Sequence, residues 1–332
     1  MNKLKKCLIL CFMGVIILQL PLQAAGLKKI AQSGMKWLSI PIGAKAAALG
    51  GAFTAMTNDV NSIFWNPAGL GFSEGRQVFL TQTQWIADIN VNAAAISYNA
   101  DAWGIFGASL IQVDWGQING TRRADNEQGF VETGTFEPKN WGIGISYARR
   151  VSQAFSFGAN LKYLYEYLGA SLEGSFDSPS RYKAEMNVLA FDFGTIYDTG
   201  FRGLKIGMAL FNFSKEQIYR AEYFPLPLTF KFGLAMDVTR LWREESQHKI
   251  TLAVDALHLR DYSERLNFGL EYNFKDMVFL RGGYKSNYDE EDLSLGAGIA
   301  YSIESITLGV DYSYVNFKHF DAVHMFSIGF MF

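Results

Sequence analysis

From Arg76 to the C-terminus, apolar and polar side chains alternate along the chain with a period of two. In residues 266–274 the alternate side chains are leucine, phenylalanine or tyrosine, and the residues between them are asparagine, glycine or glutamate. Residues 228–237 and 306–314 follow the same pattern. Because successive side chains of a β-strand point to opposite faces, this alternation predicts strands with one apolar face and one polar face.

The alternating segments number about fourteen, and single-chain bacterial outer-membrane barrels have an even number of strands. The expected strands cover residues 76–86, 91–99, 102–111, 139–150, 154–166, 186–198, 202–213, 228–239, 248–258, 265–274, 277–285, 292–302, 304–315 and 323–332. Short connections alternate with longer ones such as 112–138, 167–185 and 214–227, and the connection at 240–247 is the one exception. This asymmetry is typical of periplasmic turns and extracellular loops.

A soluble β-sandwich would show the same alternation, so further features have to distinguish it from a membrane barrel. Apolar faces end in aromatic residues, as at Tyr163, Tyr165 and Tyr167, which matches the aromatic girdles where a barrel meets lipid headgroups. The opposite faces carry charged residues in mid-strand, namely Lys162, Asp192, Lys205, Lys231, Asp237, Asp255, Glu271, Arg281 and Asp311. These charges would be costly in a sandwich core, whereas in a polar lumen they can pair. We therefore predict an antiparallel outer-membrane β-barrel over residues 76–332.

The N-terminus has the pattern of a secretory signal peptide. Three lysines precede an apolar run over residues 7–18, and Ala24 offers a small residue at a cleavage point. The run is shorter than the roughly 20 residues that a membrane-spanning helix needs. We therefore expect a signal peptide at 1–24 and a mature chain that begins near Ala25.

Composition excludes several classes of site. Both cysteines, Cys7 and Cys11, lie in the expected signal peptide, so the mature chain can form no disulfide, cysteine zinc cluster or thiol nucleophile. The formal net charge of -2 gives no basic face for nucleic acid. Aromatic residues make up 15% of the chain, with 32 glycines and 7 prolines, a balance that favours an outer-membrane barrel over a soluble disulfide scaffold.

Residues 43–70 differ from the rest of the chain because they do not alternate and are crowded with alanine and glycine. We call this segment the hatch. Its distinctive residues are Gly43, Ala44, Gly50, Gly51, Asn58, Asp59, Trp65, Asn66, Pro67, Ala68 and Gly69. The glycine pair permits a sharp change of direction, and Asn66 before Pro67 suggests a capped helical turn. Two interpretations stay open here: a plug enclosed by the barrel, or an ordinary buried helix followed by a loop.

Residues 26–40 precede the hatch with apolar side chains near helical spacing, which predicts a short amphipathic helix. We expect this helix and the hatch to form one N-terminal unit over residues 25–75. At the other end of the chain, Phe330 and Phe332 lie on one apolar face. The terminal aromatic resembles the assembly signal of bacterial outer-membrane barrels, which implies the barrel assembly machinery as a partner.

The sequence offers no convincing catalytic or metal site. None of the four histidines lies within a nucleophile signature, and residues 144–148 (GISYA) lack the second glycine of such a motif and lie in an expected strand. The acidic residues at 289–292 could bind a cation, but an exposed acidic loop is the commoner case. We expect a non-enzymatic protein with no cofactor and no metal.

The N-terminal segment resembles the signature of the PorV/PorQ family, relatives of the FadL fatty-acid transporter. The resemblance rests on MKWLSI at 35–40, GAKA at 43–46, LGGAFTA at 49–55, Asn58-Asp59 and WNPAGL at 65–70. It implies a fourteen-stranded barrel in the outer membrane of a Gram-negative bacterium, with the hatch inside the lumen.

The resemblance also implies two functions. PorV-type members act at the outer membrane in type IX secretion, which implies secretion-system components and cargo proteins as partners. FadL-type members pass hydrophobic small molecules such as long-chain fatty acids inward. The signature lies nearer PorV/PorQ, so a role in type IX-like secretion comes first and a hydrophobic channel is the alternative. In either case outer-membrane lipid and lipopolysaccharide surround the barrel.

Two glycines in the third expected strand, Gly104 and Gly107, are candidates for a lateral opening. Glycine within a strand commonly marks a bulge or a close backbone approach, and in FadL relatives this strand is kinked inward. The alternative is that these glycines only relieve crowding against the hatch.

Overall fold

The structure, a computed structural model, describes residues 32–175, 178–219, 222–242 and 246–332. The expected signal peptide and residues 26–31 of the expected amphipathic helix lie outside the described residues.

Fourteen strands close into an antiparallel barrel, which confirms the predicted fold class. They are β1 (Arg76–Gln84), β2 (Asn90–Asn99), β3 (Ile105–Asp114), β6 (Lys139–Arg150), β7 (Phe155–Ser175), β8 (Ser178–Asp198), β9 (Lys205–Phe213), β12 (Thr229–Asp237), β13 (His248–Leu259), β14 (Arg265–Phe274), β15 (Val278–Ser286), β16 (Glu291–Ile303), β17 (Ile306–Phe317) and β18 (Val323–Met331). Strands that follow one another in this list pair side by side, and β18 pairs with β1 from Gln77↔Met331 to Gln84↔His324.

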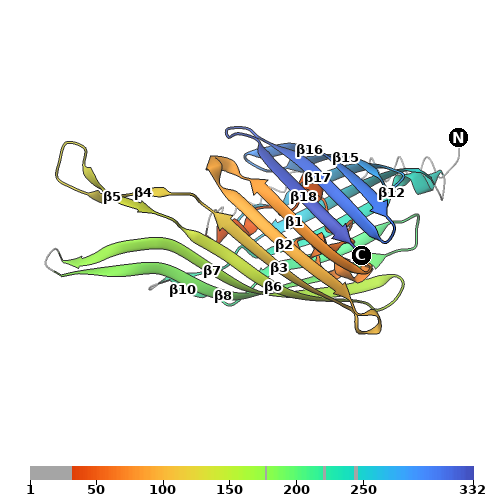
Figure 1. The fold of residues 1–332 in the computed structure, drawn as a ribbon, viewed down its shortest axis with the longest axis horizontal. Coiled ribbons are helices and arrows are strands. Elements are labelled where there is room, and N and C mark those ends of the chain that lie inside the picture. The colour runs from red at the N-terminus through yellow and green to blue at the C-terminus, as the bar shows by residue number, and fades with distance from the viewer. Residues whose placement is uncertain (1–31, 176–177, 220–221, 243–245) are drawn as a thin grey trace.

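The long connections are more ordered than the sequence predicts. The segment 112–138 contains a hairpin of β4 (Ile118–Arg123) and β5 (Phe130–Phe136), and 214–227 contains β10 (Gln217–Tyr219) and β11 (Glu222–Phe224). The segment 167–185 mainly continues β7 and β8, which are 21 residues long each. In Figure 1 the β4–β5 hairpin and the ends of β7 and β8 project beyond one end of the barrel, here called the long-loop end.

The described helices are short. The hatch holds α2 (Ala44–Ala48) and the 3₁₀ helices η2 (Val60–Phe64) and η3 (Pro67–Phe72), and three further 3₁₀ turns, η4 (Ile86–Asp88), η5 (Asp101–Trp103) and η6 (Val238–Leu241), join strands. No helix among the described residues is long and apolar enough to cross a membrane.

The expected amphipathic helix over 26–40 is wrong for its described part. Residues 32–40 contain only the single 3₁₀ turn η1 (Lys36–Ser39). Met35 takes a left-handed backbone conformation with φ 50°, which an α-helix cannot include. Of the apolar residues that set the helical spacing, the structure describes Leu38, which packs against the core beside the buried Met35 and Trp37.

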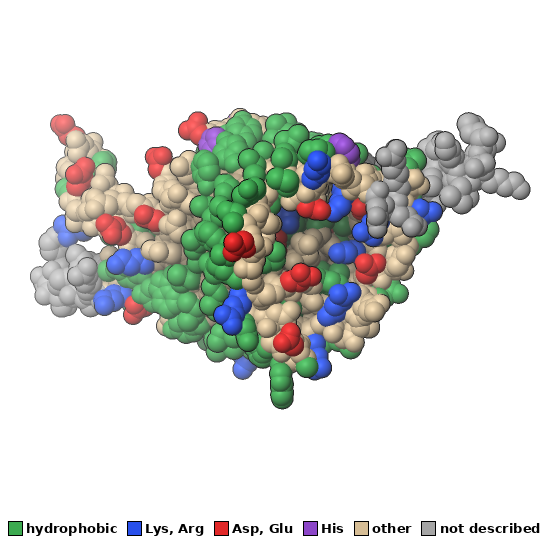
Figure 2. All heavy atoms as spheres, turned by 45° about the vertical axis from the view of Figure 1, so that its right-hand side comes forward, with side chains coloured by type: hydrophobic (Ala, Val, Ile, Leu, Met, Phe, Trp, Pro, Cys, Tyr) green, Lys and Arg blue, Asp and Glu red, His purple; other side chains and the backbone are tan. Residues whose placement is uncertain are grey.

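The outer face of the wall is apolar. Leu189, Leu280 and Ile299 have exposed fractions of 56%, 54% and 63%, as expected of side chains that contact lipid. Aromatic side chains gather there too, and the rings of Trp141 and Tyr165 stack at 5.4 Å. Figure 2 shows apolar side chains gathered in a broad band on the wall, with charged side chains mainly outside it.

Candidate functional site

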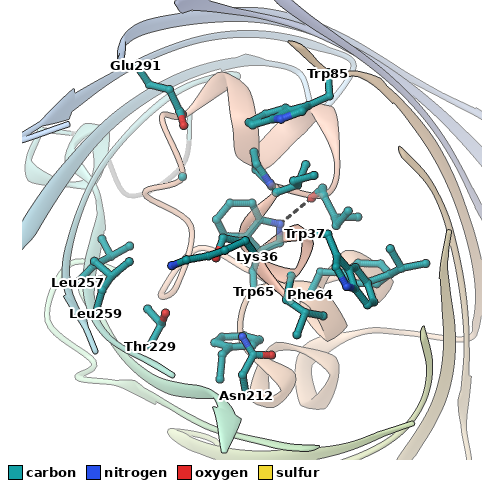
Figure 3. A pocket seen from close by; sticks show the side chains of 18 of the residues that line it. Lys36, Trp37, Phe64, Trp65, Trp85, Asn212, Thr229, Leu257, Leu259 and Glu291 are labelled. Carbon is teal, nitrogen blue, oxygen red and sulfur yellow. Dashed lines mark hydrogen bonds between the residues drawn. The ribbon is translucent and has the colours of Figure 1, made fainter. Parts of the chain in front are cut away.

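The hatch is bonded to opposite walls of the barrel. On one side, Ala44 N donates to Ser327 Oγ of β18 at 2.9 Å, and Ser294 Oγ of β16 donates to Ala48 O at 3.1 Å. On the other, Ser156 Oγ of β7 donates to Ala68 O at 2.8 Å. Since β16 and β7 lie half-way around the ring from each other, the hatch crosses the lumen, as the encircling ribbon in Figure 3 makes visible.

Inward-facing glycines let the hatch backbone approach the wall. A Cβ added to Gly283 would lie 2.0 Å from Gly50 N, and one added to Gly158 would lie 2.4 Å from the carbonyl carbon of Pro67. Real Cβ contacts are never that short, so only glycine fits these two positions without a shift of the hatch. These contacts are not among the predictions from the sequence, although their signal, glycine at inward positions of expected strands, is present in it.

Asp255 anchors the middle of the hatch. Its Oδ2 accepts from the backbone N–H of Phe53 at 3.0 Å, the backbone N–H of Thr54 at 2.9 Å and Thr54 Oγ1 at 2.6 Å. The side chain comes from β13 and is buried. Hydrogen bonds to a charged acceptor contribute more than neutral ones, so this carboxylate fixes the point where the hatch turns after Gly51.

Replacing Asp255 with alanine should loosen this turn. Two backbone N–H groups would lose their acceptor in a buried site, and each hydrogen bond to a charged group contributes about 1.5–3 kcal/mol. We expect faster amide hydrogen exchange over residues 52–57 in Asp255→Ala. Asp255→Asn, which retains one acceptor oxygen, should give a smaller increase. Equal exchange in the parent and Asp255→Ala would contradict the anchor.

The other expected lumen charges also lie on the inner face, mostly in pairs. Arg281 Nε lies 2.6 Å from Glu271 and its Nη1 lies 2.5 Å from Asp311. Lys162 Nζ lies 2.7 Å from Asp192 Oδ1. Removing one member of a buried pair typically destabilises by about 3–5 kcal/mol, because it leaves the other charge without a partner.

Three further expected lumen charges make different contacts. Lys231 Nζ lies 4.4 Å from the ring centroid of Trp65, which brings a cation against the aromatic face of the hatch. Lys205 lies in the same way over Phe72, at 5.2 Å. Asp237 accepts from the backbone N–H of Thr239 at 3.0 Å and caps η6.

The hatch motif residues shape the segment itself. Gly50 and Gly51 have φ of 64° and 78°, so the sharp change of direction is made by the residues expected to make it. Asn66 Oδ1 accepts from Ala68 N at 3.1 Å with Pro67 at the first position of η3. Asp59 caps η2 and accepts from Lys45 Nζ at 3.0 Å.

The remaining motif residues differ in role. Trp65 Nε1 donates to Ile42 O at 2.7 Å, the dashed line of Figure 3. A Cβ on Gly69 would lie 2.6 Å from Thr57 Oγ1. A Cβ on Gly43 would lie 2.8 Å from Asn61 Nδ2. Asn58 is exposed.

A cavity of about 610 Å³ lies between the hatch and the long-loop end. Figure 3 shows Trp37, Phe64, Trp65 and Trp85 around it, with Lys36 extending across it. Aromatic and charged side chains therefore both line the cavity.

The N-terminal side of this cavity is attached to the connection between β13 and β14. Asp261 accepts from Ser33 Oγ at 2.7 Å and from Lys36 Nζ. Burial alone would raise the pKa of the Asp261 carboxyl, but the hydrogen bonds from Lys36 and Ser33 outweigh it and hold that pKa below its usual value. The contribution of these contacts to stability is therefore fully present above the ordinary pKa of an aspartate carboxyl. It is lost as the pH falls through the lowered pKa of Asp261.

Comparison with protein families gives two matches. The family of the type IX secretion system protein PorV matches residues 23–200, more than half of the 332 residues. The chain belongs to the PorV family. The family of the type IX secretion system membrane protein PorP/SprF also matches, over residues 125–330.

Membership confirms the resemblance predicted from residues 35–70. It also confirms a protein of type IX-like secretion in the outer membrane of a Gram-negative bacterium. Both families are non-enzymatic membrane components. No curated protein sequence matches the chain.

Solved structures show the same fold. A FadL homologue of Pseudomonas aeruginosa is 12% identical, with a TM-score of 0.54 over 88% of this chain and 98% of its own. The toluene transporter TodX of Pseudomonas putida is 12% identical, with a TM-score of 0.55 over 87% of this chain and 96% of its own. At this identity the likeness establishes the FadL-like architecture of the PorV-family barrel and nothing about its ligand.

The wall of the PorV-family barrel is unbroken at the two glycines expected to open it. Gly104, with φ 92°, lies in the turn before β3 rather than within the strand. Gly107 lies within β3, where a Cβ would meet Ile63 Cδ1 of the hatch at 2.9 Å. β3 pairs without a register shift with both β2 and β6. The lateral opening stays a prediction, and it would require this pairing to break.

The two C-terminal phenylalanines lie together on the barrel's surface. The rings of Phe330 and Phe332 stack at 6.5 Å, and Phe332 N donates to Arg76 O at 2.9 Å beside the first strand. Their role as an assembly signal stays a prediction.

Among the residues that the structure describes, the histidines and acids of the PorV-family barrel lie apart from one another or in single pairs. His319 Nδ1 lies 2.9 Å from Glu290 and His248 Nδ1 lies 2.7 Å from Tyr272 Oη, both at exposed positions. Ser146 donates to Asn160 Oδ1 at 3.0 Å on the inner face of β6. Among the described residues, no group of three or more histidines, cysteines and acids is placed to hold a metal ion.

Proposed function

We propose that this PorV-family barrel works in the closed state, as a non-enzymatic component that binds cargo or other secretion components rather than as an open pore. The observation that carries the proposal is the hydrogen bonding of the hatch to opposite walls, through Ser294 and Ser156. A segment held on both sides would block ions and solutes from crossing the lumen.

The binding surface in this proposal is the long-loop end, which faces outward if the long connections are extracellular. The projecting hairpins expose apolar side chains there. Phe130 of β5 is 42% exposed, Ile218 of β10 is 56% exposed and Tyr223 of β11 is 66% exposed. Apolar side chains that gather on hairpins outside the membrane wall are typical of surfaces that contact other proteins.

A second function, uptake of hydrophobic small molecules, is favoured by one observation. The cavity of about 610 Å³ has Trp37, Phe64 and Trp65 in its lining beside charged residues such as Lys36 and Lys231, and pockets of this size that combine apolar walls with polar groups are typical of small-molecule sites. In this alternative the ligand would enter from the long-loop end and the hatch would have to move to release it.

Deletion of the gene, followed by complementation, tests the first function against the second. Without the barrel, we expect proteins normally released from the cell to accumulate in the periplasm, because their outer-membrane step is lost. The parent gene should restore release. A variant with residues 118–136 replaced by a short glycine-serine turn should restore it poorly although the barrel is present in the membrane.

An uptake assay with a fluorescent fatty acid, on the same strains, distinguishes the secretion role from the hydrophobic channel. Normal release in the deletion strain together with slower uptake of the fatty acid would reject the secretion role and support the hydrophobic channel.

A further inference from the structure

The outer wall carries a row of three amide side chains across adjacent strands. Gln82 of β1 pairs with Asn92 of β2, and Asn92 pairs with Gln112 of β3. All three are exposed on the face that elsewhere contacts lipid. Within the part of the chain that the structure describes, none of the three amides has a hydrogen-bond partner.

The same row is aromatic on both sides of these amides. Gln82 pairs with Phe326 of β18, and Gln112 pairs with Trp141 of β6. An amide without a hydrogen-bond partner is costly in contact with hydrocarbon. These three amides therefore require a neighbour that can hydrogen-bond.

A groove lies directly beneath the amide row. In the next row toward the turn end, Ala94 lies between Leu80 and Leu110, which are 48% and 45% exposed. The small side chain leaves a depression of about 440 Å³, lined on its other side by Phe326 and Ile328. The depression is thus apolar below and lined by amides above.

We propose that this groove binds a lipopolysaccharide molecule, with one acyl chain over Ala94 and its linkage groups hydrogen-bonded to Gln82, Asn92 and Gln112. The groove is continuous with the apolar wall that contacts lipid, which favours a lipid over a protein occupant. It lies in the half of the wall nearer the long-loop end, which is the outer leaflet in the orientation proposed above. Lipopolysaccharide fills that leaflet in Gram-negative bacteria.

The chemistry of the groove matches one part of this lipid. Amide side chains both donate and accept hydrogen bonds, and the acyl chains of lipopolysaccharide are joined to its sugars by amide and ester groups. No charged side chain lines the groove, so it addresses the neutral linkage region and not the phosphates. The site therefore binds a lipid whose amide or ester linkages lie at the level of the three amide side chains.

Two variants and a matched control test the site. Gln82→Leu/Asn92→Leu/Gln112→Leu removes the amides, and Ala94→Phe fills the groove. Ala297→Phe is the control, because Ala297 is an outward alanine on another part of the wall, flanked by Leu280 and Tyr312. All of these place apolar side chains on the lipid face, where a barrel tolerates them. Heat-modifiable gel migration checks that each barrel is folded.

Lipopolysaccharide retention is measured on purified protein, so its result is independent of the secretion assay. Each barrel is mixed with lipopolysaccharide in detergent, washed, and analysed for bound 3-hydroxy fatty acid. We expect roughly tenfold less bound lipid in the triple variant and in Ala94→Phe, since hydrogen bonds and groove contacts are lost, and parent-like retention in Ala297→Phe. Equal retention in all four proteins would overturn the proposal.

A photoreactive amino acid at position 110 identifies the neighbour in cells. An adduct with lipopolysaccharide that is lost in Ala94→Phe supports the site. An adduct with a protein and none with lipid would overturn it and assign the groove to a protein partner instead.

Discussion

Deleting residues 43–70 should turn a barrel that passes few ions into one that conducts them readily across a planar bilayer. The hatch bonds to β16 and β18 on one side and to β7 on the other, so its removal would leave a lumen lined by charged and polar side chains. The fourteen strands close on one another without the hatch, and the wall should therefore still insert. We expect single-channel conductance to rise by an order of magnitude or more, as for a water-filled barrel.

Barrel integrity has to be shown alongside this result. Heat-modifiable migration of the deletion variant would establish that the wall is folded. Conductance equal to that of the intact protein, from a folded barrel, would argue against a plug. High conductance of the intact protein would also argue against a plug.

Replacing Gly283 with valine should displace the hatch while leaving the wall in place. A side chain at this position would collide with Gly50 N and with the carbonyl carbon of Leu49, which lies 2.3 Å from the added Cβ. Overpacking usually costs about 1–3 kcal/mol, and a collision with the backbone peptide unit between Leu49 and Gly50 should reach at least the upper end. We expect residues 46–56 to exchange their amide hydrogens faster and bilayer currents to show intermittent opening.

The adjacent glycine supplies the control for this substitution. Gly282 faces outward, and a Cβ added there would meet only Leu295 Cδ2 at 3.8 Å, an ordinary contact. Valine is favoured in strands, so Gly282→Val should leave exchange and conductance unchanged. Identical behaviour of the two variants would show that the close approach at Gly283 does not hold the hatch.

The strands could be predicted because the membrane imposes their pattern. Lipid on one side and a polar lumen on the other force alternation in β14 or β17, where each side chain has a single environment. The β4–β5 hairpin has no such constraint. Almost all of its residues are exposed, so neither strand shows an apolar face that sequence reading could detect.

For the candidate site, the sequence indicates individual residues but not the contacts between them. The place of Asp255 in a strand predicts a lumen charge, yet its partners, Phe53 N and Thr54 N, lie about two hundred residues earlier. No local pattern encodes such a pairing. Residues 26–40 illustrate the opposite failure, because their apolar spacing predicts a helix, whereas the left-handed backbone of Met35 excludes one.

The pairing of the first strand with the last determines the order in which parts of the barrel can assemble. Ala44 N reaches Ser327 Oγ across 283 positions of sequence, so this contact cannot form until the final strand has been made and delivered to the membrane. Contacts between such distant positions are slow to form, because the intervening chain must first lose much of its freedom. Until β18 meets β1, the growing sheet has an unpaired edge at each end. The seam between β1 and β18 is therefore the last gap through which the hatch can enter the lumen from the side. Once these two strands pair, the hatch can enter only through an end of the barrel.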